Sequence, residues 1–76
     1  MQISDLPQIL ARHNVPPSHY SLSPADEPMT ESYLCIRMYP VICIYIVERN
    51  RITLRRTFDT EDAACRAFLH ELRITP

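Results

Sequence analysis

Glycine is absent from this 76-residue chain, and lysine is absent as well. Without glycine, every turn that needs a positive φ angle must use another residue, and asparagine and aspartate adopt that conformation most readily. The same absence excludes the glycine-rich loops that cradle phosphate groups in nucleotide-binding proteins. All eight cationic residues are arginine, for which the composition of a GC-rich genome is the simpler explanation. Arginine is also the cation best suited to protein interfaces.

Long apolar runs and paired cysteines are also missing. The longest apolar run covers residues 41–47, far short of the roughly 20 residues that a membrane-spanning helix needs. The first ten residues have neither the basic start nor the apolar core of a signal peptide. The chain has three cysteines, and an odd number is a poor basis for a disulfide framework. We therefore expect a cytoplasmic protein with free thiols and no membrane partner.

Length and charge narrow the class of protein further. A chain of 76 residues predicts a single domain over residues 1–76. A domain of this size buries only about 60% of its unfolded surface, so its margin of stability is small. The net charge of −1 and the pI of about 6.2 lack the basic excess that is typical of nucleic-acid-binding domains.

The pattern of apolar residues and helix caps predicts an α+β protein. We expect a helix over about residues 5–14, a polar loop over 18–30, three strands over 32–58 and a helix over 60–73. Asp5 or Ser4 can cap the first helix, and Asn14 can end it in a left-handed conformation. Asp59 or Thr60 can cap the last helix. The predicted order is α-β-β-β-α, a three-stranded antiparallel meander with the helices packed on one face.

The register of the predicted strands follows from matching their apolar residues. Three-residue turns at residues 38–40 and 48–50, with Asn50 left-handed, place isoleucine and leucine opposite each other. A two-residue turn would instead put Val47 opposite Ile52 and mix the two faces. The predicted core face of the sheet then consists of Leu34, Ile36, Ile42, Ile44, Ile46, Ile52 and Leu54.

The opposite face of the sheet is the candidate binding surface. The run 41–47 is apolar at every position, so the strand must hide both faces or keep one for a partner. The predicted register puts Tyr33 opposite Tyr45 on this face, and tyrosine and arginine are the residues most enriched in binding hot spots. An alternative is that a helix or the loop 18–30 folds over this face. The candidate partner-binding residues are Tyr33, Arg37, Tyr45, Arg51, Thr53 and Arg55.

Catalytic and metal-binding arrangements are not indicated. Cys35 and Cys43 are too far apart in sequence for the close cysteine pair that is typical of zinc sites. Cys65 and His70 would lie on different sides of the last helix, which does not suit a nucleophile and its base. We therefore expect no enzyme activity, no catalytic residue, no metal and no cofactor.

An RNA-binding protein is the alternative function. The α-β-β-β-α order is also that of the double-stranded-RNA-binding domain, which this chain resembles in length and element order. Those domains hold RNA phosphates with lysines at the start of the last helix, where this chain has Asp59, Glu61 and Asp62, which repel phosphate. A small regulatory RNA-binding module therefore remains the second hypothesis, and nucleic acid is not the expected partner. The residues in its favour are Arg49, Arg51, Arg55 and Arg56.

A set of residues from position 32 onward forms a strand–turn–strand–helix signature. Its members are Tyr33, Cys35 and Ile36, then Tyr45, Glu48, Arg49, Asn50, Ile52 and Leu54, then Phe58 to Cys65 without a gap, and finally Phe68 and Leu69, with a weaker match at Val15, Pro16 and Tyr20 to Leu22. In these residues the chain resembles small immunity proteins that are encoded beside polymorphic bacterial toxins. The resemblance covers about half of the chain and contains no catalytic motif. It departs from the family where Asn50 replaces a turn glycine and where Ile42 replaces a large aromatic residue.

The resemblance implies a protein that neutralises a cognate toxin by direct binding. Proteins of this kind are small, cytoplasmic and acidic to neutral. The expected partner is a protein toxin encoded by the adjacent gene, held in a 1:1 or 2:2 complex, so that homo-oligomers of this chain are compatible with the hypothesis.

Overall fold

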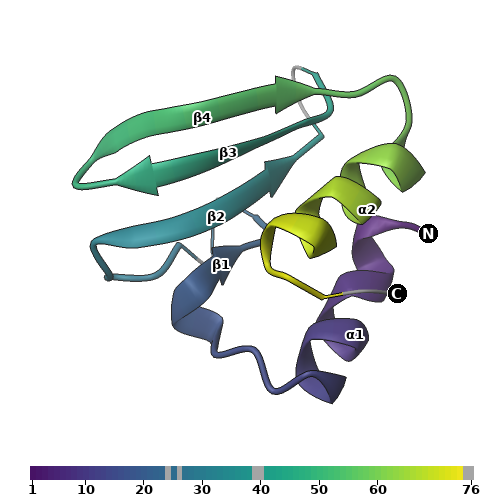
Figure 1. The fold of residues 1–76 in the computed structure, drawn as a ribbon, viewed down its shortest axis with the longest axis horizontal. Helices are drawn as coiled ribbons and strands as arrows, with labels where there is room; N and C mark the ends of the chain where they lie inside the picture. Colours follow the sequence, from purple (N-terminus) through teal and green to yellow (C-terminus); the bar gives the residue numbers. More distant parts are fainter. Residues whose placement is uncertain (24, 26, 39–40, 75–76) are drawn as a thin grey trace.

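The computed structural model describes residues 1–23, 25, 27–38 and 41–74. The described elements form a mixed sheet with the strand order β1-β2-β3-β4, and both helices lie on one side of it (Figure 1). The predicted α+β class and the predicted placement of the helices on one face are therefore confirmed. In chain order the elements are η1 (Ile3–Asp5), α1 (Leu6–Arg12), η2 (Pro17–His19), β1 (Tyr20–Ser21), β2 (Ser32–Arg37), β3 (Cys43–Glu48), β4 (Arg51–Thr57) and α2 (Glu61–Glu71).

Local sequence signals set the ends of the two helices. The Thr60 side chain accepts a hydrogen bond from the Ala63 backbone N–H at 3.1 Å and thereby caps α2. Pro7 lies in the first turn of α1, where its missing N–H costs nothing. Asn14 has a φ of 57°, which confirms the predicted left-handed end of this helical segment. Both helices stop short of the predicted C-terminal limits, residues 14 and 73.

The core lies between the helices and one face of the central strands. Leu34, Ile36 and Ile44 project from β2 and β3 toward the helices and are almost completely buried. Because residues two apart in a strand share a face, these positions confirm the predicted core face for β2 and β3. The helix side contributes Leu6, Leu10, Ala64, Cys65, Phe68 and Leu69, together with Ile74 after α2.

The first strand was not predicted. The segment 18–30, expected to be a polar loop, starts with the end of η2 and with β1, which pairs with β2 in parallel. Tyr20 lies opposite Leu34, and Ser21 lies opposite Cys35. The described sheet is therefore mixed, with four strands instead of three antiparallel ones. A two-residue strand that contains a serine gives no apolar alternation from which it could be predicted.

The register of β2 against β3 differs from the prediction by two residues. Leu34 lies opposite Ile46 and Ile36 opposite Ile44, and Tyr33 faces Val47 instead of Tyr45. A shift of two residues leaves every side chain on its predicted face, because the side-chain period of a strand is also two. The predicted turn at residues 38–40 lies partly outside the described residues.

The turn between β3 and β4 is shorter than predicted, and this changes β4. Arg49 and Asn50 form a two-residue turn in which both residues are left-handed, with φ angles of 49° and 67°. The Arg49 N–H donates a hydrogen bond to the Glu31 carbonyl at 2.8 Å, which helps to hold this conformation. Ile52 therefore lies opposite Val47, on the side of the sheet away from the helices, and is 60% exposed. Its prediction as a core residue was wrong.

A bulge then restores the predicted alternation farther along β4. The register shifts between Ile46 and Val47, so that Ile46 lies opposite Leu54 in the backbone pairing. Thr53 is the extra residue that this shift leaves without a Cα partner on β3. The side chain of Leu54, which was predicted to face the core, is not described. No described helix is long and apolar enough to span a membrane.

Candidate protein-binding surface

The outer face of the sheet, the side away from the helices, is divided into a covered half and an open half. In the covered half, over β1, the end of β2 and the start of β3, Ser21 and Cys35 have no exposed surface and Cys43 is 4% exposed. Glu27, from the segment after β1, reaches across to Arg37 on β2 at 3.3 Å. The described part of the segment 18–30 therefore contacts this half of the face.

The Arg37 side chain connects β2 to β1 in the covered half through hydrogen bonds. Its Nη1 donates to the carbonyl oxygens of Ser21 at 3.1 Å and Ile36 at 2.8 Å. Its Nη2 donates to the Ser21 hydroxyl at 2.8 Å, and its guanidinium lies 6.0 Å from the centre of the Tyr45 ring. The side chain is only 11% exposed. Arg37 is thus engaged within the chain, whereas we had predicted it as a partner contact.

Burial favours the neutral form of two of the three buried thiols. Burial raises the pKa of the Cys35 thiol, and the nearby Arg37 guanidinium lowers it only in part. Burial also raises the pKa of the Cys65 thiol, to about 11. These two thiols are neutral at pH 7, and a neutral thiol is a weak nucleophile and metal ligand. Within the described residues, no group of three or more histidine, cysteine or carboxylate side chains could hold a metal ion.

The open half of the outer face extends over β4, most of β3 and the start of β2. Tyr45 on β3 is half-buried and lies opposite Arg55 on β4, which is exposed. Val47 lies between Tyr33 and Ile52 in the strand pairing, and both Tyr33 and Val47 are half-buried. We call Tyr33, Tyr45, Val47, Ile52 and Arg55 the outer patch. The structure therefore keeps Tyr33, Tyr45 and Arg55 of the predicted binding residues on one face.

Arg51 and Thr53, also predicted on this face, are placed on the helix side. Arg51 lies opposite Glu48 in the two-residue-turn register. Thr53, the bulge residue, lines the same shallow hollow as Glu48 and Arg51. Glu48 follows the outward-facing Val47 in β3, so Glu48 faces the helix side. Cross-strand partners share a face, so Arg51 faces the helix side as well. The short turn thus exchanged Arg51 for Ile52 on the outer face. The exposed Ile52 was missed because the prediction rested on isoleucine-to-isoleucine matching.

Positive charge is concentrated on β4 and the turn before it. Residues 49–57 carry four arginines and no carboxylate, so the rest of the chain has a net charge of −5. Arg49, Arg51, Arg55 and Arg56 are all exposed. The guanidinium of Arg56 lies 3.8 Å from the Glu71 carboxylate and 5.4 Å from the centre of the Phe58 ring. A chain that is nearly neutral overall therefore has one strongly cationic edge.

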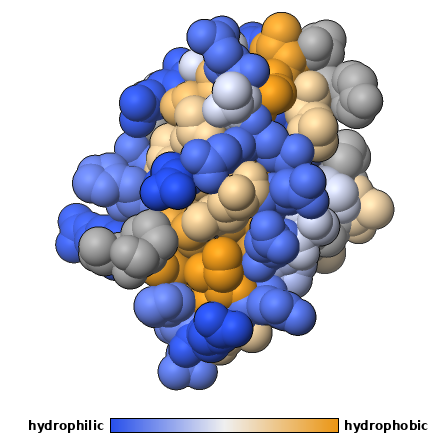
Figure 2. Space-filling model, turned by 90° about the vertical axis from the view of Figure 1, so that its right-hand side faces the viewer, coloured by the Kyte–Doolittle hydropathy of each residue, from blue (hydrophilic) through white to orange (hydrophobic). Residues whose placement is uncertain are grey.

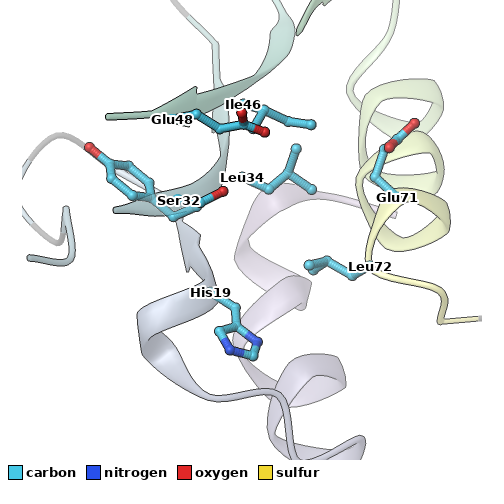
Figure 3. Close-up of a pocket in the computed structure, with 8 residues that line it drawn as sticks. His19, Ser32, Leu34, Ile46, Glu48, Glu71 and Leu72 are labelled. Carbon is cyan, nitrogen blue, oxygen red and sulfur yellow. The ribbon is translucent and has the colours of Figure 1, made fainter. Parts of the chain in front are cut away.

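The helix side of the molecule has a different character. Seen from the right-hand side of Figure 1, where the helices and both termini lie, the surface is mostly hydrophilic, with one hydrophobic patch in the lower part of the view and a smaller one at the top (Figure 2). An open cavity of about 320 Å³ lies where the sheet meets the end of α2. Leu34, Ile46 and Leu72 surround it, with His19 at one end and Glu48 at the other (Figure 3). Tyr33, which belongs to the outer patch, also lines this cavity.

Comparison with protein-family models, with curated proteins and with solved structures gave no match.

Proposed function

We propose that this chain is a protein-binding module that neutralises a cognate bacterial toxin by direct, stoichiometric contact. The observation that carries the proposal is the outer patch, in which Tyr45, Ile52 and Arg55 lie together on the open half of an ordered sheet. Tyrosine and arginine dominate binding hot spots, and aromatic and apolar residues are typical of the centre of an interface. The choice of a toxin as the partner rests on the sequence resemblance alone.

The rigidity of the outer patch supports this role. Its residues belong to paired strands, so a partner would not have to order them on binding. Tyr45 packs against Arg37 on one side and faces Arg55 on the other, which limits its rotamers. A preformed surface of this kind can block the active site or the substrate path of an enzyme without changing its own shape. We expect a 1:1 or 2:2 complex in the cytoplasm, with the product of the adjacent gene as the partner.

The experiment is co-expression with the product of the neighbouring reading frame, followed by measurement of the affinity of the purified complex. Ile52→Ala and Arg55→Ala should each weaken binding about tenfold or more if they lie at the centre of the interface. Arg12→Ala is the matched control, because Arg12 is an exposed arginine at the end of α1, on the helix side of the sheet. Equal affinity of all three variants, or no complex at all, would contradict the proposal.

The four exposed arginines of residues 49–57 favour a second candidate, the small regulatory RNA-binding module. Binding of this kind depends on phosphate contacts and therefore weakens steeply as salt rises. Affinity for a double-stranded RNA should be measured over a series of salt concentrations. Submicromolar RNA binding that persists at moderate salt, with no protein partner recovered, would replace the toxin-binding proposal.

A further inference from the structure

Among the described residues, no strand pairs with the outer edge of β4. β4 is the last strand in the described order and pairs with β3 on one side only. The Phe58 N–H donates to the Ile42 carbonyl at 2.9 Å, just beyond the two strands. Because hydrogen-bonded and non-bonded pairs alternate in an antiparallel ladder, Arg55 and Thr57 point their N–H and C=O groups away from β3. These backbone groups can pair with an added strand.

The two edges of the described sheet differ in length and protection. β1, at the other edge, has only two residues, whereas β4 has seven. Exposed edges of this length invite pairing, and native proteins protect them with bulges and charged side chains. β4 has both, a bulge at Thr53 and the arginines at positions 51, 55 and 56. Its stretch after the bulge, residues 54–57, keeps regular pairing with residues 43–46 of β3.

The charge of β4 decides which strand fits this edge. An antiparallel pair of two β4 strands would bring three arginines from each copy together, and like charges directly opposite destabilise a strand pair. A strand that carries carboxylates would instead face Arg55 and Arg56 with the opposite charge. The edge therefore disfavours a second copy of this chain and favours an acidic segment.

We propose that β4 binds an extended, acidic segment of a partner protein as an added antiparallel β-strand. This inference rests on the proposed function, in which the partner is the toxin. The added strand would continue the sheet, so every second side chain would lie beside Arg55 and Ile52 of the outer patch. Backbone hydrogen bonds to Arg55 and Thr57 would hold the segment, and carboxylates beside the arginines would select it.

The experiment titrates the full, ¹⁵N-labelled chain with two synthetic peptides of equal length and alternating pattern, one of valine and glutamate and one of valine and lysine. We expect the glutamate peptide to bind at least about tenfold more tightly, because each cross-strand charge pair changes sign between the two peptides. Binding of the glutamate peptide should shift the β4 amide resonances and slow hydrogen exchange at the Arg55 and Thr57 amides. Weak or equal binding of both peptides, or shifts confined to other elements, would overturn the inference.

A proline substitution tests the backbone contact itself. Thr57→Pro removes an outward N–H without removing a bond to β3, and Thr57→Val keeps the N–H with a side chain of similar shape. Affinity for the glutamate peptide should fall about fivefold or more in the proline variant and stay unchanged in the valine variant. If the proline variant does not fold, the exchange rates of the unmodified chain decide the question. Unchanged affinity in a folded Thr57→Pro chain would overturn the inference.

Further outcomes distinguish between the possible ligands of the β4 edge. They also distinguish failure of the edge inference from failure of the proposed function. If the free chain forms a dimer and Thr57→Pro dissociates it, the edge binds a second copy of the chain. If a single-stranded oligonucleotide displaces the peptide, the edge binds nucleic acid. Either result overturns the inference. If the neighbouring gene product binds the Thr57→Pro chain with full affinity, the edge inference fails while the proposed function stands. If the glutamate peptide protects the β4 amides but no protein partner binds, the proposed function fails while the edge site stands.

Discussion

Replacing Arg37 by alanine should destabilise the fold, although arginine is usually a surface residue. The guanidinium lies over the half-buried Tyr45 ring and donates hydrogen bonds to Ser21, Ile36 and Glu27. It connects β2 to β1 and to the segment after β1. Alanine at position 37 would remove these contacts and open the covered half of the outer face to water.

The expected cost follows from the exposure of each contact. A hydrogen bond from a charged donor contributes about 1.5–3 kcal/mol when it is shielded from water. The contact with Glu27, whose side chain is 49% exposed, adds only about 0–1 kcal/mol. Water can replace part of the remainder, so we expect the free energy of unfolding to fall by about 2–4 kcal/mol. A chain of this length has only about 4–11 kcal/mol in total, so the loss is large.

Urea denaturation followed by circular dichroism measures this difference. With a slope of about 1 kcal/mol per molar urea for so small a protein, the midpoint should fall by about 2 M or more. Arg55→Ala is the matched control, since Arg55 borders the same Tyr45 from the opposite strand but is exposed. Its free energy of unfolding should change by less than about 0.5 kcal/mol. Arg37→Lys should fall in between, because one ammonium cannot reproduce the contacts of a two-nitrogen fork.

The assignment of Arg37 as a structural residue would be refuted if both alanine variants behaved alike. A change below about 0.5 kcal/mol for Arg37→Ala would show that water replaces its hydrogen bonds without cost. In that case the Arg37 side chain would be free to serve a partner, as the sequence prediction had it.

Three further predictions concern the core, the cap and the thiols. Ile44→Ala should lower the free energy of unfolding by about 2–5 kcal/mol, because Ile44 is fully buried. In the same urea titration, Ile52→Ala should change the free energy of unfolding by less than about 0.5 kcal/mol, because Ile52 is exposed. Thr60→Ala should lower it by about 1 kcal/mol through loss of the α2 cap, with a matching loss of amide protection at Ala63 that Thr60→Ser would largely prevent. The Cys65 thiol should react slowly with an alkylating reagent at pH 8 and faster as the pH approaches its pKa of about 11, since only the thiolate reacts; rapid labelling of the folded chain at pH 8 would contradict this.

Helix ends and strand faces were predictable because local chemistry determines them. Thr60, Pro7 and Asn14 each act within one helical turn, so their effect can be recognised without knowledge of the fold. The faces of β2 and β3 were correct even though their register was not, because a shift by two residues preserves the side-chain alternation. The candidate site kept Tyr33 and Tyr45 for the same reason.

The parts that failed depend on contacts between distant residues. Arg49 adopts a left-handed conformation that few non-glycine residues take, and its N–H bonds to Glu31, eighteen positions earlier. Nothing in the sequence near Arg49 indicates that contact, so the short turn and the bulge at Thr53 were missed. The pairing of Ser21 with Cys35 and the burial of Arg37 are likewise long-range. These contacts decided which half of the outer face remains open.

The glycine-free composition has a consequence for the unfolded state. Four left-handed positions among the described residues are occupied by Asn14, Arg49, Asn50 and Arg73, all of which restrict the backbone more than glycine would. Together with seven prolines, they leave the denatured ensemble fewer conformations to explore. Folding therefore loses less backbone entropy per residue than in a glycine-rich chain of equal length. The smaller loss of backbone entropy on folding thus offsets part of the stabilisation that so small a core cannot supply.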